Sequence, residues 1–324
     1  MRYRSNPTLT SWIVGIGSAL GGAALLYRTR PSKAPCVKWG EGQIAASLET
    51  SVVSESSGIA RSSKGDWWTH NDSGGKASLF AFSTDGSFIG ESPITGSNFV
   101  DWEGLSTGKC PSGSWGGKGC VYIADFGDNS EKRGSIQIYA VKEPQAGNST
   151  EVLATWNVTY PDRSHNAEAL LVSPKGEILI VTKETRGDAA FVFSVPSSPG
   201  DVTAEHVGSI PGFVGNRKIT GGSWSANGKN IVLLTYGNAY IWKVQIGGKV
   251  NWEQPPIEVK LAETRKAEAI DFDTRGNLIL TSEGNPMPIQ VIKCTGRSLL
   301  YQGAWWGALG MYLGGAVWLW SHRL

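Results

Sequence analysis

The stretch that most constrains the fold is "NAEALLVSPKGEILIVTKE", residues 166–184, which reads as a strand, a tight turn and a second strand. Its turn is Ser-Pro-Lys-Gly, and a glycine there can adopt the positive φ that such turns use. Related units occur four more times along the chain, at residues 57–72, 101–129, 220–238 and 266–285. Such copies are expected to stack against one another, because one hairpin alone cannot bury its apolar faces.

Each hairpin is followed by further strands. The segments "SLFAFS", "IQIYAV", "FVFSV", "AYIWKV" and "PIQVIK" come after the five hairpins, and looser strands such as "VLATWNVTY" precede the next unit. Units of four strands repeated every 45–65 residues or so are typical of propeller blades. We therefore predict an all-β, five-bladed β-propeller over residues 36–294, with a six-bladed ring as the alternative. Between the strands there is no amphipathic helical period, which argues against a βαβ fold.

The two ends of the predicted propeller are expected to complete one blade together. The fifth unit has only three strands before Cys294, and "CVKWGEGQIAASLE", which starts at Cys36, has no other place. We expect this segment to supply the missing outer strand and a Cys36–Cys294 disulfide to hold it. Cys110 and Cys120 would pin the loop between them. An even number of cysteines beside an export signal indicates an oxidising compartment.

Both ends of the chain resemble membrane segments. Residues 12–27 and 298–321 carry no charge, and the second is long enough to cross a bilayer. We predict an N-terminal anchor within residues 1–30, with a cleaved signal peptide as the alternative, and a C-terminal transmembrane helix at 298–321. Small residues spaced for close packing and interfacial tryptophans supply the candidate helix contacts. These are Gly17, Gly21, Gly303, Gly307, Trp305 and Trp306.

Disulfides and anchors together predict a location. The propeller is expected on the periplasmic side of a membrane, most simply the bacterial inner membrane, with both termini in the cytoplasm. The formal net charge of +2 gives no basic excess for nucleic acid. The expected partners are therefore the lipid bilayer and other membrane-protein subunits, and not nucleic acid.

Carboxylates recur at the outer ends of the predicted hairpins. In a propeller the start of the inner strand and the end of the second strand lie at the same mouth of the central channel, so these side chains should gather there. The candidates are Glu103, Glu168, Glu268, Asp125, Asp72, Glu184 and Glu283. Ca²⁺ is the cation that best suits such a set of oxygen ligands. Protons, basic partners such as Lys183, or backbone amides of the neighbouring blade are the alternatives. The fourth unit has no acid and carries Gly222 and Tyr236 instead.

Four motifs carry a resemblance to known proteins. "NDSGG", "DWEGL", "ADFGDN" and "NAEAL" are similar to a largely uncharacterised family of exported bacterial β-propeller domains. More distantly, the chain resembles phytase-like and gluconolactonase-like propellers. That resemblance implies a propeller whose channel holds Ca²⁺ among acidic ligands, and it carries no activity across. The chain departs from those enzymes in having fewer predicted blades and no acid in the fourth.

Other catalytic signals are sparse. The predicted propeller contains neither a Gly-x-Ser-x-Gly nucleophile elbow nor a phosphate-binding P-loop. The sequence alone favours a membrane-anchored binding or scaffolding platform, an accessory subunit of a larger membrane complex such as a photosynthetic or respiratory one. The alternative is a Ca²⁺-dependent propeller hydrolase that acts on phosphoesters or lactones.

Overall fold

The computed structural model describes residues 34–111, 119–263 and 266–298. Within them, Pro35–Gly296 form one compact unit. The predicted membrane anchors and their glycine and tryptophan contacts lie outside the described residues, except for Ser298. In the described part of the chain no helix is long and apolar enough to cross a membrane.

The compact unit is built from β-strands in four-stranded runs. The first run contains β2 (Ser56–Arg61), β3 (Trp67–Asn71), β4 (Ser78–Phe82) and β5 (Phe88–Thr95). The second contains β6 (Trp102–Lys109), β7 (Gly119–Asp125), β8 (Ile136–Lys142) and β9 (Thr150–Thr159). The third contains β10 (Ala167–Val172), β11 (Ile178–Thr182), β12 (Ala189–Val195) and β14 (Glu205–Pro211). The fourth contains β15 (Gly221–Trp224), β16 (Asn230–Leu234), β17 (Asn238–Lys243) and β18 (Ile257–Lys260). The last contains β19 (Ala267–Phe272), β20 (Leu278–Ser282), β21 (Met287–Arg297) and β1 (Cys36–Leu48).

The runs differ in how they join their neighbours. The first two form one larger sheet, because the ends of β5 and β9 pair in parallel and β13 (Gly200–Thr203) also pairs in parallel with β9. The other three are separate four-stranded sheets. A short 3₁₀ turn at Gly215–Arg217 is the only helical element in the residues described.

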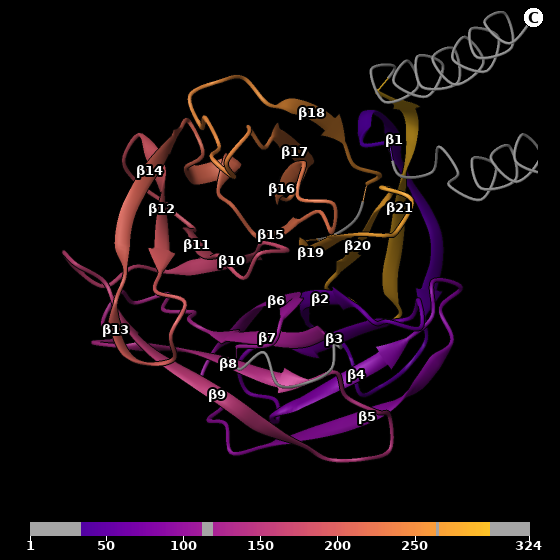
Figure 1. Ribbon diagram of the computed structural model, residues 1–324. Coiled ribbons are helices and arrows are strands. Elements are labelled where there is room, and N and C mark those ends of the chain that lie inside the picture. The colour runs from indigo at the N-terminus through magenta and orange to yellow at the C-terminus, as the bar shows by residue number, and fades with distance from the viewer. Residues whose placement is uncertain (1–33, 112–118, 264–265, 299–324) are drawn as a thin grey trace, which may run out of the picture. The chain divides into compact units, whose positions relative to one another are not determined.

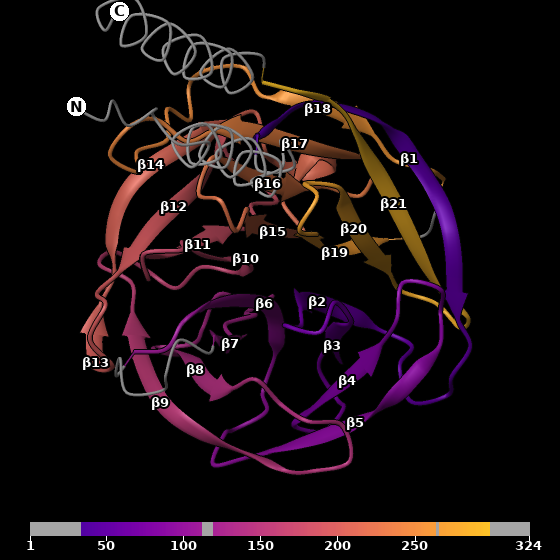
Figure 2. The ribbon, with the colours of Figure 1, turned by 45° about the vertical axis from the view of Figure 1, so that its right-hand side comes forward.

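The runs are arranged around a common centre, as in a propeller. The innermost strands β2, β6, β10, β15 and β19 each neighbour the next, and β19 returns to β2 (Figures 1 and 2). Each of the described hydrophobic clusters lies between two neighbouring runs. One of them joins the first and last runs through Ile59 and Ile279. The buried apolar faces of adjacent sheets therefore hold the ring together.

The chain ends of the ring meet as the sequence predicts. Strand β1 pairs with β21, so an N-terminal segment completes the last sheet. A disulfide joins Cys36 to Cys294 with a Cα–Cα distance of 5.9 Å. A second disulfide joins Cys110 to Cys120, with a Cα–Cα distance of 5.0 Å. Both predicted cysteine pairings are confirmed.

The hairpin turns also follow their sequences. Gly176 in the Ser-Pro-Lys-Gly turn has φ 92°, and Gly276 in the Asp-Thr-Arg-Gly turn has φ 79°. Both values lie in the left-handed region that glycine adopts at no steric cost. In these two runs the turn chemistry therefore fixes the two innermost strands in antiparallel pairing, with the start of one beside the end of the other.

Candidate metal centre

A β-bulge recurs near the start of four of the five inner strands. The register shifts lie between Ser56 and Gly58, Trp102 and Gly104, Ala167 and Ala169, and Ala267 and Ala269. The extra residues are Ser57, Glu103, Glu168 and Glu268. Strand β15 pairs regularly here and carries Gly222. Because a bulge re-aims a side chain, the inner strands present these polar groups at one end of the ring.

Three carboxylates meet at this end of the ring. Ligand oxygens of Asp72, Asp101 and Glu103 all lie within 4.8 Å of one another. Asp72 follows β3, Asp101 directly precedes β6, and Glu103 is the bulge residue of β6. The Glu103 side chain is buried, and Asp101 Oδ1 is buried with no hydrogen-bond partner among the described residues.

A glycine makes room for this group. A Cβ atom on Gly127 would lie 2.5 Å from Asp101 Cγ and 2.9 Å from Glu103 Oε1. Contacts this short do not occur between real atoms, so any larger residue would displace the carboxylates. The "ADFGDN" segment therefore brings bare backbone against the two acids.

Glu168 joins the group from the next run. Its Oε1 accepts a hydrogen bond from Lys183 Nζ at 2.6 Å, and both groups are largely buried. Glu103 and Glu168 also hydrogen-bond to each other, and Ser57 Oγ donates to Glu103 Oε2 at 2.5 Å. Burial and the charges of Glu168 and Asp72 hold the pKa of Glu103 well above its usual range. Burial also raises the pKa of Glu168, and the charge of Lys183 opposes that rise.

Two further acids hold protons near neutral pH. Burial and the neighbouring Asp72 raise the pKa of Asp101 to about 7. Burial raises the pKa of Glu268 to about 8, with Lys183 opposing and Glu168 adding to the rise. Glu268 Oε2 is buried and has no hydrogen-bond partner in the ranges described. Tyr236, from the run whose inner hairpin lacks an acid, lies against Glu268 and has its pKa raised to about 12 by burial and by that charge.

Asp125 is held by backbone amides and by an arginine. Its carboxylate accepts backbone N–H groups of Val100 and Asp101, each at 3.1 Å, and pairs with Arg133 at 2.8 Å. These bonds fix the chain entering β6, which carries Asp101 and Glu103. Asp125 therefore positions the cluster of Asp72, Asp101 and Glu103, and it is not itself a free ligand of that cluster.

Glu184 and Glu283 also have partners of their own. Glu184 lies 3.3 Å from His165 Nδ1 and 3.7 Å from Arg163. Glu283 pairs with Lys266 at 2.9 Å in a solvent-accessible position. Of the seven acids predicted from sequence, the structure thus brings Asp72, Glu103 and Glu168 together around Asp101. Glu268 lies beside Lys183.

Backbone capping does not account for the inner-strand glutamates. Among the hydrogen bonds of the described residues, none runs from a backbone amide to Glu103, Glu168 or Glu268. Backbone amides do donate to Asp125, from Val100 and Asp101, and to Asp72, from Ser73. The sequence reasoning missed Asp101 as a central member and Gly127 as its support, although both stand in the quoted motifs "DWEGL" and "ADFGDN".

The residues present fit a hard cation. All donors in the group are carboxylate oxygens, which Ca²⁺ prefers. Asp72, Asp101, Glu103 and Glu168 face one ammonium group, Lys183, so the site holds an excess of negative charge that protons offset when no cation is bound. Asp101 Oδ1 is a buried oxygen without a partner among the described residues, and the absence of a side chain at Gly127 lets Asp101 and Glu103 approach each other.

Comparisons with known proteins show similarity only in the course of the backbone. No protein-family model and no curated protein matches the sequence. A putative oxidoreductase (glucose dehydrogenase) from Thermus thermophilus is 9% identical, covers 79% of this chain and 100% of its own, and has a TM-score of 0.44. A streptogramin B lyase is 11% identical over 78% of this chain and 98% of its own, with a TM-score of 0.39. A gluconolactonase from Xanthomonas campestris is 10% identical over 80% of this chain and 98% of its own, with a TM-score of 0.42. At these values the likeness carries no argument about activity.

Proposed function

We propose that this chain is a five-bladed propeller that binds Ca²⁺ at Asp72, Asp101 and Glu103 and hydrolyses a phosphoester or a lactone there. The observation that carries the proposal is the convergence of three carboxylates from two runs, with ligand oxygens within 4.8 Å of one another. The five-membered cycle of inner strands supports the blade count.

The described residues suit hydrolysis in three ways. A Ca²⁺ ion at this site would polarise a substrate oxygen and lower the pKa of bound water. Glu168, paired with Lys183, can in its ionised form accept a proton from water. Glu268 carries a proton up to about pH 8 and has an unpartnered oxygen, so it can donate that proton to a leaving group.

A cavity adjacent to Glu184 supports an anionic substrate. It has a volume of 450 Å³ and is lined by Asn129, Glu184, Arg163 and Arg186 among others. Guanidinium groups bind phosphate oxygens through paired hydrogen bonds. Arg163 already pairs with Glu131 at 2.7 Å, and Asp188 also lines the cavity, so Arg186 is the guanidinium group that favours a phosphoester over a lactone.

We also propose that the domain works outside the cytoplasm, anchored by the apolar segments at its two ends. Its two disulfides support an oxidising compartment. The role of an accessory subunit in a larger membrane complex, which the sequence favoured, becomes the competing outcome of the functional test.

The test is turnover by the purified full chain. Release of nitrophenol from p-nitrophenyl phosphate and the opening of a δ-lactone are followed with added Ca²⁺ and with a chelator. We expect Ca²⁺-dependent turnover, faster on the phosphoester, that is lost in Glu168→Gln. The matched control is Glu205→Gln, at an exposed glutamate on β14, which should keep full turnover.

Two results would overturn the proposal. Folded wild-type protein that turns over neither substrate in the presence of Ca²⁺ would exclude hydrolysis of these classes. Equal turnover in Glu168→Gln and Glu205→Gln would exclude the mouth as the site. Stoichiometric partner chains co-purifying with an inactive protein would instead support the scaffold.

A further inference from the structure

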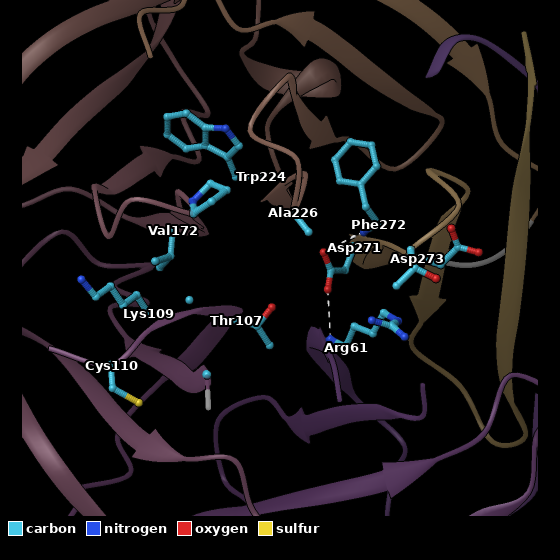
Figure 3. A pocket seen from close by; sticks show the side chains of 14 residues that line it. Arg61, Thr107, Lys109, Cys110, Val172, Trp224, Ala226, Asp271, Phe272 and Asp273 are labelled. Atoms are coloured by element: carbon cyan, nitrogen blue, oxygen red, sulfur yellow. Dashed lines mark hydrogen bonds between the residues drawn. The ribbon is translucent and has the colours of Figure 1, made fainter. Parts of the chain in front are cut away.

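A second cavity lies at the opposite ends of the inner strands (Figure 3). Its volume is 530 Å³. The last residue of each inner strand lines it, namely Arg61, Lys109, Val172, Trp224 and Phe272. The carboxylate group lies near the starts of these strands, so the two sites are at different ends of the ring.

The walls of this cavity are largely apolar and include aromatic rings. Val172 and Pro174 from one run and Trp224 and Phe272 from the next two line it. The volume falls within the range of roughly 300–1,000 Å³ that small-molecule sites occupy. Aromatic side chains of this kind favour a ligand with a planar apolar body.

The acids that border the cavity are already satisfied. Asp271 accepts hydrogen bonds from Ser223 Oγ at 2.5 Å and from the backbone N–H groups of Phe272 and Arg61 at 2.7 and 3.0 Å. Figure 3 shows Asp271 held between Arg61 and its own strand. Asp273 accepts three hydrogen bonds from residues of its own turn. The cavity therefore offers few open acceptors.

The donors that border the cavity are not satisfied. Arg61 attracts Asp271 electrostatically, but neither its guanidinium group nor the Lys109 ammonium group forms a hydrogen bond or ion pair with a residue in the described ranges. Figure 3 shows the two side chains on opposite sides of the cavity. Trp224 is only 7% exposed, and its Nε1 is a buried donor with no partner among the described residues. Because this nitrogen is inaccessible to solvent, the donors that a ligand in the cavity can reach are those of Lys109 and Arg61.

We propose that this cavity binds a small organic anion with a flat apolar body, such as an aromatic carboxylate, sulfonate or phosphate. The ring packs between Trp224, Phe272 and Val172, while the anionic group accepts hydrogen bonds from Lys109 or Arg61. The proposal is independent of the cation site and of the hydrolase function, because no residue is shared between the two ends.

The test uses 2-naphthalenesulfonate as the probe. It is titrated calorimetrically into the full chain in a non-ionic detergent, and the heat of a protein-free detergent blank is subtracted. We expect one saturable site, and roughly tenfold weaker binding in Lys109→Gln, the loss of one charge-assisted hydrogen bond. The matched control is Lys132→Gln, at an exposed lysine between β7 and β8, which should bind like wild type. The neutral 2-naphthalenesulfonamide should bind at least tenfold more weakly than the sulfonate.

A second variant separates a specific site from adsorption to apolar surface. Trp224→Phe keeps an aromatic side chain but removes one ring of the apolar wall, and it should weaken the sulfonate several-fold. Added Ca²⁺ should leave the affinity unchanged. Equal affinity of the sulfonate for wild type, Lys109→Gln and Trp224→Phe would overturn the proposal, as would equal affinity of sulfonate and sulfonamide for the wild type.

Discussion

Replacing Gly127 by alanine tests the carboxylate group through a single methyl group. The added Cβ would stand 2.5 Å from Asp101 Cγ and 2.9 Å from Glu103 Oε1, so one or both acids must move. Overpacking of a filled site costs about 1–3 kcal/mol of unfolding free energy. Removing a glycine from the unfolded chain returns about 0.4–1 kcal/mol, so we expect a net loss of about 1–2 kcal/mol. Displaced ligands should also weaken Ca²⁺ binding at least tenfold, since the cation needs several oxygens at about 2.3–2.6 Å.

Gly134→Ala is the matched control. Gly134 lies on the same run, has no positive φ, and a Cβ there would meet nothing within 4 Å. It should be neutral or stabilise slightly through the unfolded chain. The measurements are urea unfolding in chelator and Ca²⁺ titration by calorimetry. If both variants unfold alike and bind Ca²⁺ alike, the described packing of Gly127 against the acids is wrong.

Three other predictions concern the same unit. Lys183→Met should cost about 3–5 kcal/mol in urea unfolding, because it leaves Glu168 buried without its cation, and adding Glu168→Gln should restore part of that loss. In chelator, the free energy of unfolding should fall as pH rises from about 4.5 towards 8, because the folded-state pKa of Glu268 lies above its unfolded value. Urea midpoints measured across this pH range should fall less steeply in Glu268→Gln. An equally steep fall in the variant would contradict the described burial of Glu268. Cys36→Ser should destabilise more than Cys110→Ser, about 5 against about 3 kcal/mol by loop entropy, because the two disulfides span 258 and 10 residues; thermal unfolding that ranks them the other way would contradict this.

Most of the fold prediction rested on the repeated strand–turn–strand units. Strand–turn–strand units with a glycine at the turn specify local pairing, and the two cysteines at the ends of residues 36–294 leave few ways to close the ring. Pairing of β1 with β21 and both disulfides could therefore be anticipated from the chain alone. The parallel contacts of β9 with β5 and β13 could not, because outer-strand contacts between runs leave no periodic signal.

The candidate site could be located but not assembled from sequence. Repeat alignment placed Glu103, Glu168 and Glu268 at equivalent positions, and the bulges explain why they face one mouth. Which acids share oxygens, protons or amides depends on distances of a few ångströms between runs, which no repeat specifies. Asp125 illustrates this, because its bonds to Arg133 and to two backbone amides remove it from the ligand set.

The cavity opposite the carboxylates had no sequence signal. Its lining comes from the last residues of inner strands, such as Lys109 and Trp224, which differ from run to run. Only the three-dimensional arrangement shows that Lys109 borders a cavity whose acids, Asp271 and Asp273, already accept hydrogen bonds from the protein.

The most direct test of the central claim is equilibrium binding of radioactive calcium to the full chain at pH 7.5, compared with Glu103→Gln. The account predicts about one bound ion per chain in the wild type, tighter as pH rises because the acids must release protons, and loss of that ion in Glu103→Gln. Absence of saturable binding by the folded wild-type protein, or equal binding by the variant, would contradict the claim that these carboxylates form a cation site.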